Sequence, residues 1–373
     1  MTDEREEDSL AYLTDGDREF INRVERTYLS DPGWLTAEEI KNLSSDDRAY
    51  RDWELSLWHG AFPYVVTTHV RFAGLQLGTV AAADPGPAAP LRTVSLLTGP
   101  PGTGKSTILQ RRGVILMKQA AQLHRIQIER ARSGRGPEPR LLRGVFRPML
   151  HVSLLRHVTD KQLFTMLCQA LPCPVTDDPS ASFIRGVWAC GTQAVLIDEI
   201  QYVNFDGQAG RYVHDALKAI TNFGVRVILC GHGVEKMLDA VRKTEAQDAA
   251  QGQSKGRWET VTIGRMEYRT QRAREDWSKL LEVVEGRIRL AGHAPGEKIL
   301  SETMADYLWV ATLGYLNSLS TLVSKGLALA LLTKQQRLTE SILDTIQVET
   351  RSDKQRLERL AVWRAGEFNW KTS

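Results

Sequence analysis

One eight-residue stretch constrains the fold of this chain more than any other. Residues 99–106 spell G-P-P-G-T-G-K-S, which fits the pattern G-x-x-x-x-G-K-[ST]. The apolar stretch 93–98 before it is typical of a buried strand, and residues 107–110 after it are typical of the first turn of a helix. This pattern cradles phosphate groups when it lies between a strand and a helix. The sequence therefore predicts an α/β fold with a phosphate site at the end of one strand.

Each residue type in this loop has a part in the chemistry. Glycines let backbone N–H groups close around phosphates without a Cβ in the way, and the helix N-terminus adds partial positive charge. Lys105 would neutralise phosphate oxygens and Ser106 would offer its hydroxyl to Mg²⁺. We expect ATP and Mg²⁺ as ligands. The expected nucleotide-binding residues are Gly99, Pro100, Pro101, Gly102, Thr103, Gly104, Lys105, Ser106 and Thr107.

A second motif, A-V-L-I-D-E at residues 194–199, stands about 90 residues downstream. Its four apolar residues are typical of a central strand in a parallel sheet, and open α/β sheets bind ligands at the carboxyl ends of their strands. Asp198 would hold the metal ion with Ser106, and Glu199 would be the general base that activates water. An acidic pair after a strand is equally typical of a helix start, but the glycine loop upstream favours the catalytic interpretation.

The pattern of the chain predicts a helical adaptor over 1–80, with helices at 17–29, 37–58 and 67–80, and an AAADPGPAAP linker over 81–90. Strands at 93–98, 149–154, 194–197, 226–230 and 260–263 alternate with helices at 106–130, 161–171, 181–190 and 210–222, which predicts a parallel sheet covered on both faces. This core would span 91–265. A small helical lid would follow over 266–350, with helices at 276–291, 299–313, 316–333 and 335–351. We expect the aromatic tail, 351–373, to dock on the protein itself rather than on a partner.

The net charge of +3 does not by itself indicate a nucleic-acid binder, but its distribution is uneven. Residues 111–147 hold ten Lys and Arg residues against two acids, with almost no aromatic residues. We expect contacts to DNA backbone phosphates without sequence preference, and a solvated surface is an equal alternative. The main candidates for DNA contact are Lys118, Arg125, Arg130, Arg132 and Arg135, and Arg140, Arg143 and Arg147 follow them.

Cysteine spacing and hydropathy exclude some other classes of protein. The four cysteines lack the C-x-x-C spacing of metal sites, and we expect reduced, mostly buried thiols. The acidic N-terminus has no apolar core typical of a signal peptide, and the uncharged run 307–324 is too polar for a membrane span. We therefore expect a cytoplasmic protein without membrane partners.

The motifs and their surroundings resemble those of AAA+ ATPases and, more narrowly, of TniB and TnsC, the ATPase regulators of Tn7-like and Tn5053-like transposons. D-E-I-Q at 198–201, the segment D-A-L-K-A-I-T-N at 215–222, C-G-H-G at 230–233 and R-W-E at 257–259 carry the likeness, which covers roughly 67–346. It implies an AAA+ core and a homo-oligomeric ring or filament that assembles with ATP on double-stranded DNA. Such a regulator recruits a transposase, meets a target selector, and is released on hydrolysis.

The resemblance also implies roles for single residues. His232 stands where AAA+ proteins place a first sensor of the γ-phosphate, and Arg257 stands where many carry an arginine finger that completes a neighbour's ATP site. Arg265 is a weaker candidate for the finger. The alternatives without a role in ATP hydrolysis are a turn histidine at 232 and a surface arginine at 257. Asn317 replaces the usual arginine of a second sensor, which favours slow turnover.

Two other functions share the same ATP motifs. One is a signalling or defence ATPase that acts through protein partners. The other is a replication initiator or helicase loader, but these usually carry a winged-helix DNA module, and the residues after 351 are too few for one. ATP-dependent DNA binding discriminates between the first of these and a transposition regulator.

Overall fold

A computed structural model describes residues 7–82, 94–136, 145–172, 174–203, 207–234, 258–348 and 353–370. The chain forms two compact units. The sheet unit comprises Met1–Arg26, Val70–Pro101 and Lys105–Ile263, and the helical unit comprises Thr27–His69, Gly102–Gly104 and Gly264–Ser373. The first 80 residues, predicted as one adaptor, thus contribute to both units.

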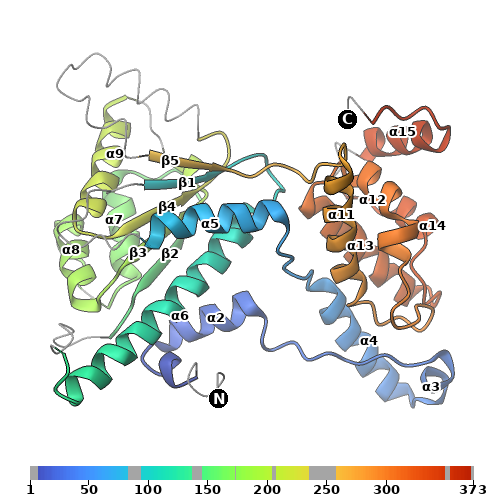
Figure 1. Ribbon diagram of the computed structural model, residues 1–373, viewed down its shortest axis with the longest axis horizontal. Helices are drawn as coiled ribbons and strands as arrows, with labels where there is room; N and C mark the ends of the chain where they lie inside the picture. Colours follow the sequence, from blue (N-terminus) through green and yellow to red (C-terminus); the bar gives the residue numbers. More distant parts are fainter. Residues whose placement is uncertain are drawn as a thin grey trace. The chain divides into compact units, whose positions relative to one another are not determined.

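The described residues of the sheet unit form five parallel strands in the order β2-β3-β4-β1-β5 (Figure 1). Every predicted strand is present, and its ends differ from the prediction by two residues at most, because each strand is a short apolar run bounded by polar residues. The α/β fold with a parallel sheet is therefore confirmed. The strands are β1 (Val94–Thr98), β2 (Met149–Ser153), β3 (Ala194–Asp198), β4 (Arg226–Cys230) and β5 (Trp258–Thr262).

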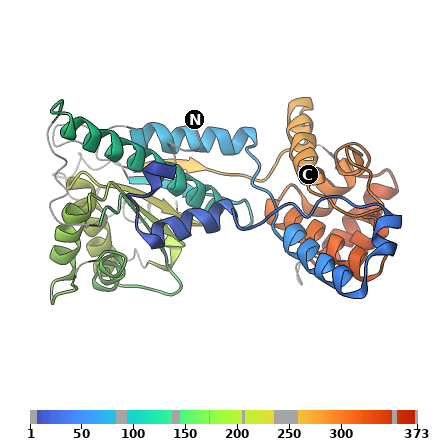
Figure 2. The same cartoon turned by 90° about the horizontal axis from the view of Figure 1, so that it is seen from below.

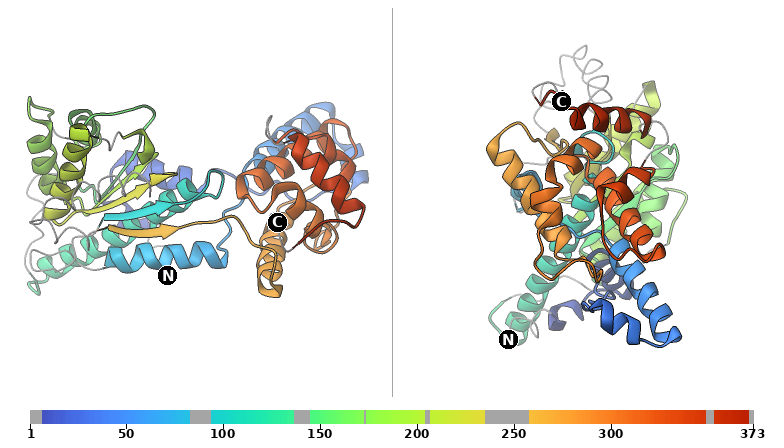
Figure 3. Two further views of the ribbon diagram at one scale, coloured as in Figure 1. Left: turned by 90° about the horizontal axis from the view of Figure 1, so that it is seen from above. Right: turned by 90° about the vertical axis from the view of Figure 1, so that its right-hand side faces the viewer.

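Helices cover both faces of this sheet, as expected (Figure 3). The long helix α6 (Lys105–Arg132) packs across β1 to β4, and α7 (Asp160–Gln169) and α9 (Gly207–Asn222) pack on the opposite face. Gly113 allows α6 to approach closely, because a Cβ there would lie 2.9 Å from the Met149 Cε atom. Other helices described in this unit are α2 (Asp15–Glu25), which packs on α6, α8 (Pro179–Cys190), which packs on α7, and α5 (Thr68–Ala82).

The helical unit has its own apolar core, built around residues such as Trp277, Tyr307 and Leu308. Within this unit α4 lies along α13 (Figure 2). The elements of this unit are α3 (Ala37–Asn42), α4 (Ser45–Gly60), α11 (Gln271–Glu285), the short η3 (Ile299–Thr303), α12 (Ala305–Thr312), α13 (Leu316–Leu332), α14 (Glu340–Thr345) and α15 (Asp353–Arg364).

Several predicted helices are wrong in extent. The helix predicted over 276–291 is α11, which begins five residues earlier and ends six residues earlier, and the one predicted over 299–313 is divided into η3 and α12. The helix predicted over 37–58 is broken into α3 and α4, because the Ser44 hydroxyl accepts the backbone N–H of Asp47 (3.1 Å) and starts a new helix. The helix predicted over 335–351 is limited to α14, since Lys334 and Gln336 have left-handed backbones and Thr339 caps the new start.

The tail packs on its own unit, as the sequence analysis favours. α15 brings the chain back across α12, and the Trp370 ring lies 5.3 Å from the ring of Tyr268 and 5.9 Å from that of Trp309. Such aromatic groups stabilise both through burial and through ring geometry. The described part of the tail is therefore part of the helical core.

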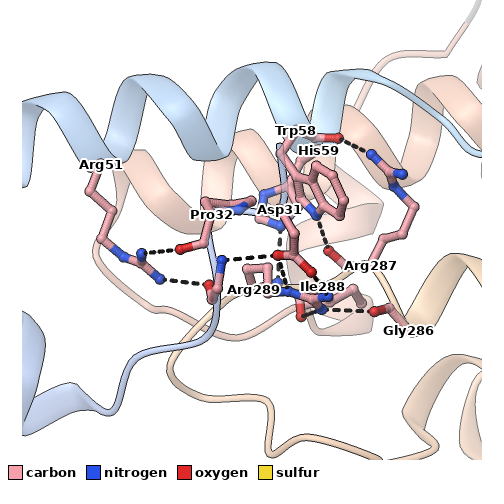
Figure 4. A network of polar contacts seen from close by, with 10 residues as sticks. Asp31, Pro32, Arg51, Trp58, His59, Gly286, Arg287, Ile288 and Arg289 are labelled. Atoms are coloured by element: carbon pink, nitrogen blue, oxygen red, sulfur yellow. Dashed lines mark hydrogen bonds and ion pairs between the residues drawn. The ribbon is translucent and has the colours of Figure 1, made fainter. Parts of the chain in front are cut away.

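A polar network joins α4 to the segment that follows α11 (Figure 4). The Trp58 indole donates to the carbonyl of Arg287 (2.7 Å), and the backbone N–H of Arg289 donates to His59 Nε2 (3.1 Å). The Arg289 side chain donates to both carboxylate oxygens of Asp31 (2.8 and 2.6 Å). Burial lowers the pKa of His59 to about 4. The buried imidazole is therefore neutral and accepts a hydrogen bond.

Cys168, Cys190 and Cys230 are buried, as expected, and form no disulfide bond with one another, and Cys173 lies outside the described residues. In the described part of the chain, no helix is by itself both long and apolar enough to cross a bilayer. The pair α12 and α13, bent by 118°, meets that criterion jointly, by length and composition only.

Candidate nucleotide-binding site

The glycine loop connects β1 to α6, as its sequence predicts. Gly99, Gly102 and Gly104 have φ values of 142°, 76° and 86°, in the region that side chains with a Cβ avoid. A Cβ on Gly99 would lie 2.0 Å from the carbonyl oxygen of Ile263, so this position requires glycine for space as well. The loop backbone can therefore turn tightly from the strand into the helix.

Lys105 begins α6, and its side chain is buried. Its ammonium donates to the Pro100 carbonyl oxygen within the same loop (2.7 Å). Burial lowers the pKa of Lys105, whereas the nearby negative charges of Glu199 and Asp198 act in the opposite direction. Asp198 ends β3 and Glu199 follows it directly, so the lysine and the two acids converge at one edge of the sheet.

Asp198 ends β3, is 4% exposed, and accepts the backbone N–H of Glu199 at Oδ1 (2.9 Å). Strand β4 lies between β3 and the strand of the glycine loop, and its last residue is Cys230. Burial raises the pKa of the Cys230 thiol, and the charge of Asp198 and a hydrogen bond to it raise it further. The thiol therefore stays protonated beside the carboxylate.

The residues expected to hold Mg²⁺ are chemically suitable. Ser106 lies in the first turn of α6 and is partly buried, and Asp198 supplies a buried carboxylate. Mg²⁺ prefers oxygen ligands and is usually held by one or two carboxylates with waters and substrate phosphates. A serine hydroxyl and one carboxylate at a phosphate cradle fit that requirement.

Sequence reasoning missed a contact between Glu199 and Gln201. The Gln201 side-chain Nε2 donates to Glu199 Oε2, and Gln201 Oε1 accepts the backbone N–H of His232 (3.3 Å). The D-E-I-Q motif contained the signal, but the spacing alone did not show that the 3-10 turn η1 (Ile200–Tyr202) folds the glutamine back. A side-chain bridge thus links the expected base to the expected sensor turn.

The other expected site residues belong to different parts of the structure. His232 is exposed on the turn that follows β4, and Arg257 lies outside the described residues. Arg265 belongs to the helical unit, where its guanidinium lies 5.8 Å from the centre of the Trp309 ring. In the same unit, the backbone N–H of Asn317 donates to the Gly102 carbonyl oxygen (3.0 Å). The backbone of the expected second-sensor position thus contacts Gly102, a residue of the same unit.

The basic stretch divides into paired and exposed residues. Lys118 forms an ion pair with Glu25 on α2 (2.9 Å), and Arg125 pairs with Glu129 and donates to the Ser9 hydroxyl (3.1 Å). Arg147 lies 3.4 Å from the buried Asp17. Two positions, Arg140 and Arg143, lie outside the described residues. Towards the end of α6 and just beyond it, three arginines are exposed and form no ion pair with any described residue: Arg130, Arg132 and Arg135.

No protein-family model matches the chain, and no curated protein matches it either. Among solved structures, a Walker-type ATPase of Pyrococcus abyssi is similar, with a TM-score of 0.38 and 15% sequence identity. The similarity covers 78% of this chain and 88% of that one. Function is therefore inferred from the residues of the site themselves.

Proposed function

We propose that this chain is a Mg²⁺-dependent ATPase that regulates DNA transposition. It assembles on double-stranded DNA when ATP is bound, recruits the transposase, and is released when ATP is hydrolysed. The observation that carries the ATPase part is the convergence of buried Lys105 with Asp198 and Glu199 at the carboxyl edge of the sheet. Loop amides and Lys105 bind the phosphates, Ser106 and Asp198 hold the metal ion, and Glu199 takes a proton from the attacking water.

The ATPase part is tested by calorimetry with ATP and with a non-hydrolysable analogue, in the presence and absence of Mg²⁺. We expect binding that Mg²⁺ strengthens, because the ion offsets charge on the phosphates and uses the Ser106 and Asp198 oxygens. If the protein binds no adenine nucleotide under these conditions, the ATPase part of the proposal is contradicted.

The DNA part is supported by the resemblance of the D-E-I-Q and L-K-A-I-T-N segments to TniB and TnsC, and by the three exposed arginines near the end of α6. Electron microscopy of the full chain with duplex DNA and a non-hydrolysable ATP analogue tests it. Rings or filaments on the DNA support transposition regulation. Particles indifferent to DNA favour the signalling ATPase, which the pairing of Lys118 and Arg125 also favours.

The contact surface is tested by the triple change Arg130→Glu, Arg132→Glu and Arg135→Glu. We expect ATP-dependent DNA binding to be lost and nucleotide binding to be retained, because charge reversal replaces attraction to phosphates by repulsion. Lys118→Ala is the matched control, since that lysine is already paired with Glu25. Unchanged DNA affinity in the triple variant rejects this surface.

A further inference from the structure

The proposed function assigns no role to the side chain of Gln201, which bridges Glu199 and His232. It belongs to η1, directly after Glu199, whose φ of 58° turns the chain sharply at the end of β3. Because β3 and β4 are neighbours in the sheet, the turns that follow them lie close together. Gln201 spans both turns through the two bonds to Glu199 Oε2 and the His232 N–H.

The chemistry of the two partners fixes the orientation of the Gln201 amide. An ionised carboxylate only accepts hydrogen bonds, and a backbone N–H only donates them. The amide nitrogen must therefore face Glu199 and the amide oxygen must face His232. A side chain of the same length without both functions cannot make this bridge.

The end of β4 is shaped to accommodate this amide. A Cβ on Gly231 would lie 2.5 Å from Gln201 Oε1 and 2.8 Å from the Ile200 Cγ2 atom, closer than real contacts allow. The buried glycine backbone thus passes directly against the glutamine. The close approach gives the amide little freedom to move away from the carboxylate.

We propose that Gln201 is a positioning residue for ATP hydrolysis, an inference that rests on the proposed function. Its amide holds one oxygen of the Glu199 carboxylate, so that the other oxygen is directed to the attacking water. The bond to the His232 N–H also couples this arrangement to the turn after β4. A displacement of that turn when it contacts the γ-phosphate thereby also moves the carboxylate of Glu199, the proposed base. Gln201 itself touches neither phosphate nor water.

The test uses the full chain with two substitutions at this position. Gln201→Leu removes both bonds at nearly constant volume, and Gln201→Glu keeps an acceptor for the His232 N–H but places a second carboxylate against Glu199. We expect kcat in single-turnover assays with radiolabelled ATP to fall about tenfold or more in both variants, because a misplaced base loses catalytic effect. We expect ATP affinity to stay within about threefold, since neither bond involves the nucleotide.

Gln193→Leu is the matched control, since it makes the same change on an exposed residue directly before β3. A second readout needs no nucleotide. Hydrogen exchange of the His232 amide in the nucleotide-free protein should be faster in Gln201→Leu than in the parent. It should be close to the parent rate in Gln201→Glu, which retains the acceptor.

The outcomes separate the two claims. A parent protein that hydrolyses ATP beside an equally active Gln201→Leu variant overturns the positioning role alone. A Gln201→Glu variant with the parent kcat also overturns the positioning role. This variant retains the contact to His232 and lacks only the hydrogen bond to Glu199, so parent activity would show that the bond to Glu199 does not matter for hydrolysis. A parent that binds no adenine nucleotide overturns the proposed function, and the role of Gln201 is overturned with it.

Discussion

The carboxyl edge of the sheet and the polar network beside α4 both bury charged or polar side chains, but they leave them in different states. At the sheet edge, Lys105 donates to a loop carbonyl and has no ion pair with a described residue. Beside α4, the Arg289 guanidinium is held by both oxygens of Asp31, and His59 accepts a backbone N–H. One region thus has charge available for a ligand, whereas the other pairs its Arg289 charge internally, although His59 Nδ1 and Arg51 Nε are buried there without a hydrogen-bond partner among the described residues.

This difference shows which buried polar groups indicate a site. A buried group that is fully hydrogen-bonded is a normal part of a protein core, whereas a buried ammonium satisfied by one carbonyl costs free energy that a bound anion can recover. The same distinction applies along α6, where Lys118 is paired and Arg130 is exposed without an ion pair to a described residue. Both residues add the same positive charge to the composition, and only the ion pair of Lys118 distinguishes them.

The largest effect that tests this comparison is expected from Glu199→Gln. The substitution removes the proposed base and leaves the phosphate contacts intact, so the hydrolysis rate should fall by about 10² to 10⁴ while ATP remains bound. Single-turnover assays and calorimetry measure the two quantities. Hydrolysis at the parent rate would show that another group activates the water.

Lys105→Ala should weaken ATP binding by at least about a hundredfold, since a charge-assisted contact contributes about 3 kcal/mol and each 1.4 kcal/mol is tenfold. Calorimetry measures the change. Lys118→Ala is the matched control on the same helix, and we expect no change in ATP affinity because that lysine pairs with Glu25. Equal losses in the two variants would contradict the contrast between available and paired lysines.

The strands and the nucleotide motifs could be predicted from the sequence because each depends on local spacing. The apolar runs before Gly99 and Asp198 define β1 and β3, and parallel pairing brings their carboxyl ends to one edge. The strand order was not predictable, because it depends on contacts between distant segments. The position of β4 between β3 and β1, which places Cys230 beside Asp198, is therefore a result of the structure.

The basic stretch and the helix boundaries were less predictable for physical reasons. The partner of Lys118 is Glu25, which is distant in sequence and is brought to α6 only by the packing of α2. Periodicity predicted one helix over 37–58, but the capping bond of Ser44 starts a second helix within it. The bridge made by Gln201 likewise depends on the left-handed backbone of Glu199. A glutamate at this position does not predict that backbone conformation.

Acid should destabilise the network beside α4 by an intermediate amount. His59 has its pKa lowered from 6.5 to about 4 by burial, so its contribution to stability is complete above pH 6.5 and is lost as the pH falls towards 4. The loss should reach about 3 kcal/mol. Urea denaturation followed by tryptophan fluorescence measures it, since all nine tryptophans except Trp188 and Trp258 belong to the helical unit.

His59→Gln is the variant that isolates this effect. Its side-chain oxygen can still accept the Arg289 N–H but does not titrate, so the variant should lose much less stability between pH 6.5 and 4 than the parent. The pH dependence of the parent also includes the other buried histidines, which the comparison removes. Parallel pH profiles for parent and variant would show that His59 is not the group responsible.

The smallest effect is expected from Asp31→Asn, which tests whether the Asp31–Arg289 ion pair beside α4 is only structural. Hydrogen bonds from Arg289 lower the pKa of Asp31, so the pair stabilises the helical unit above pH 3.8 and loses its contribution as the pH falls below that value. Because 47% of the Asp31 side chain is exposed, solvent screening limits the contribution to about 1 kcal/mol. The unfolding free energy should fall by that amount at pH 7 and by less at pH 3, and ATP affinity should be unchanged. A change in ATP affinity of tenfold or more would show that this network is coupled to the nucleotide site and would remove the contrast between the two regions.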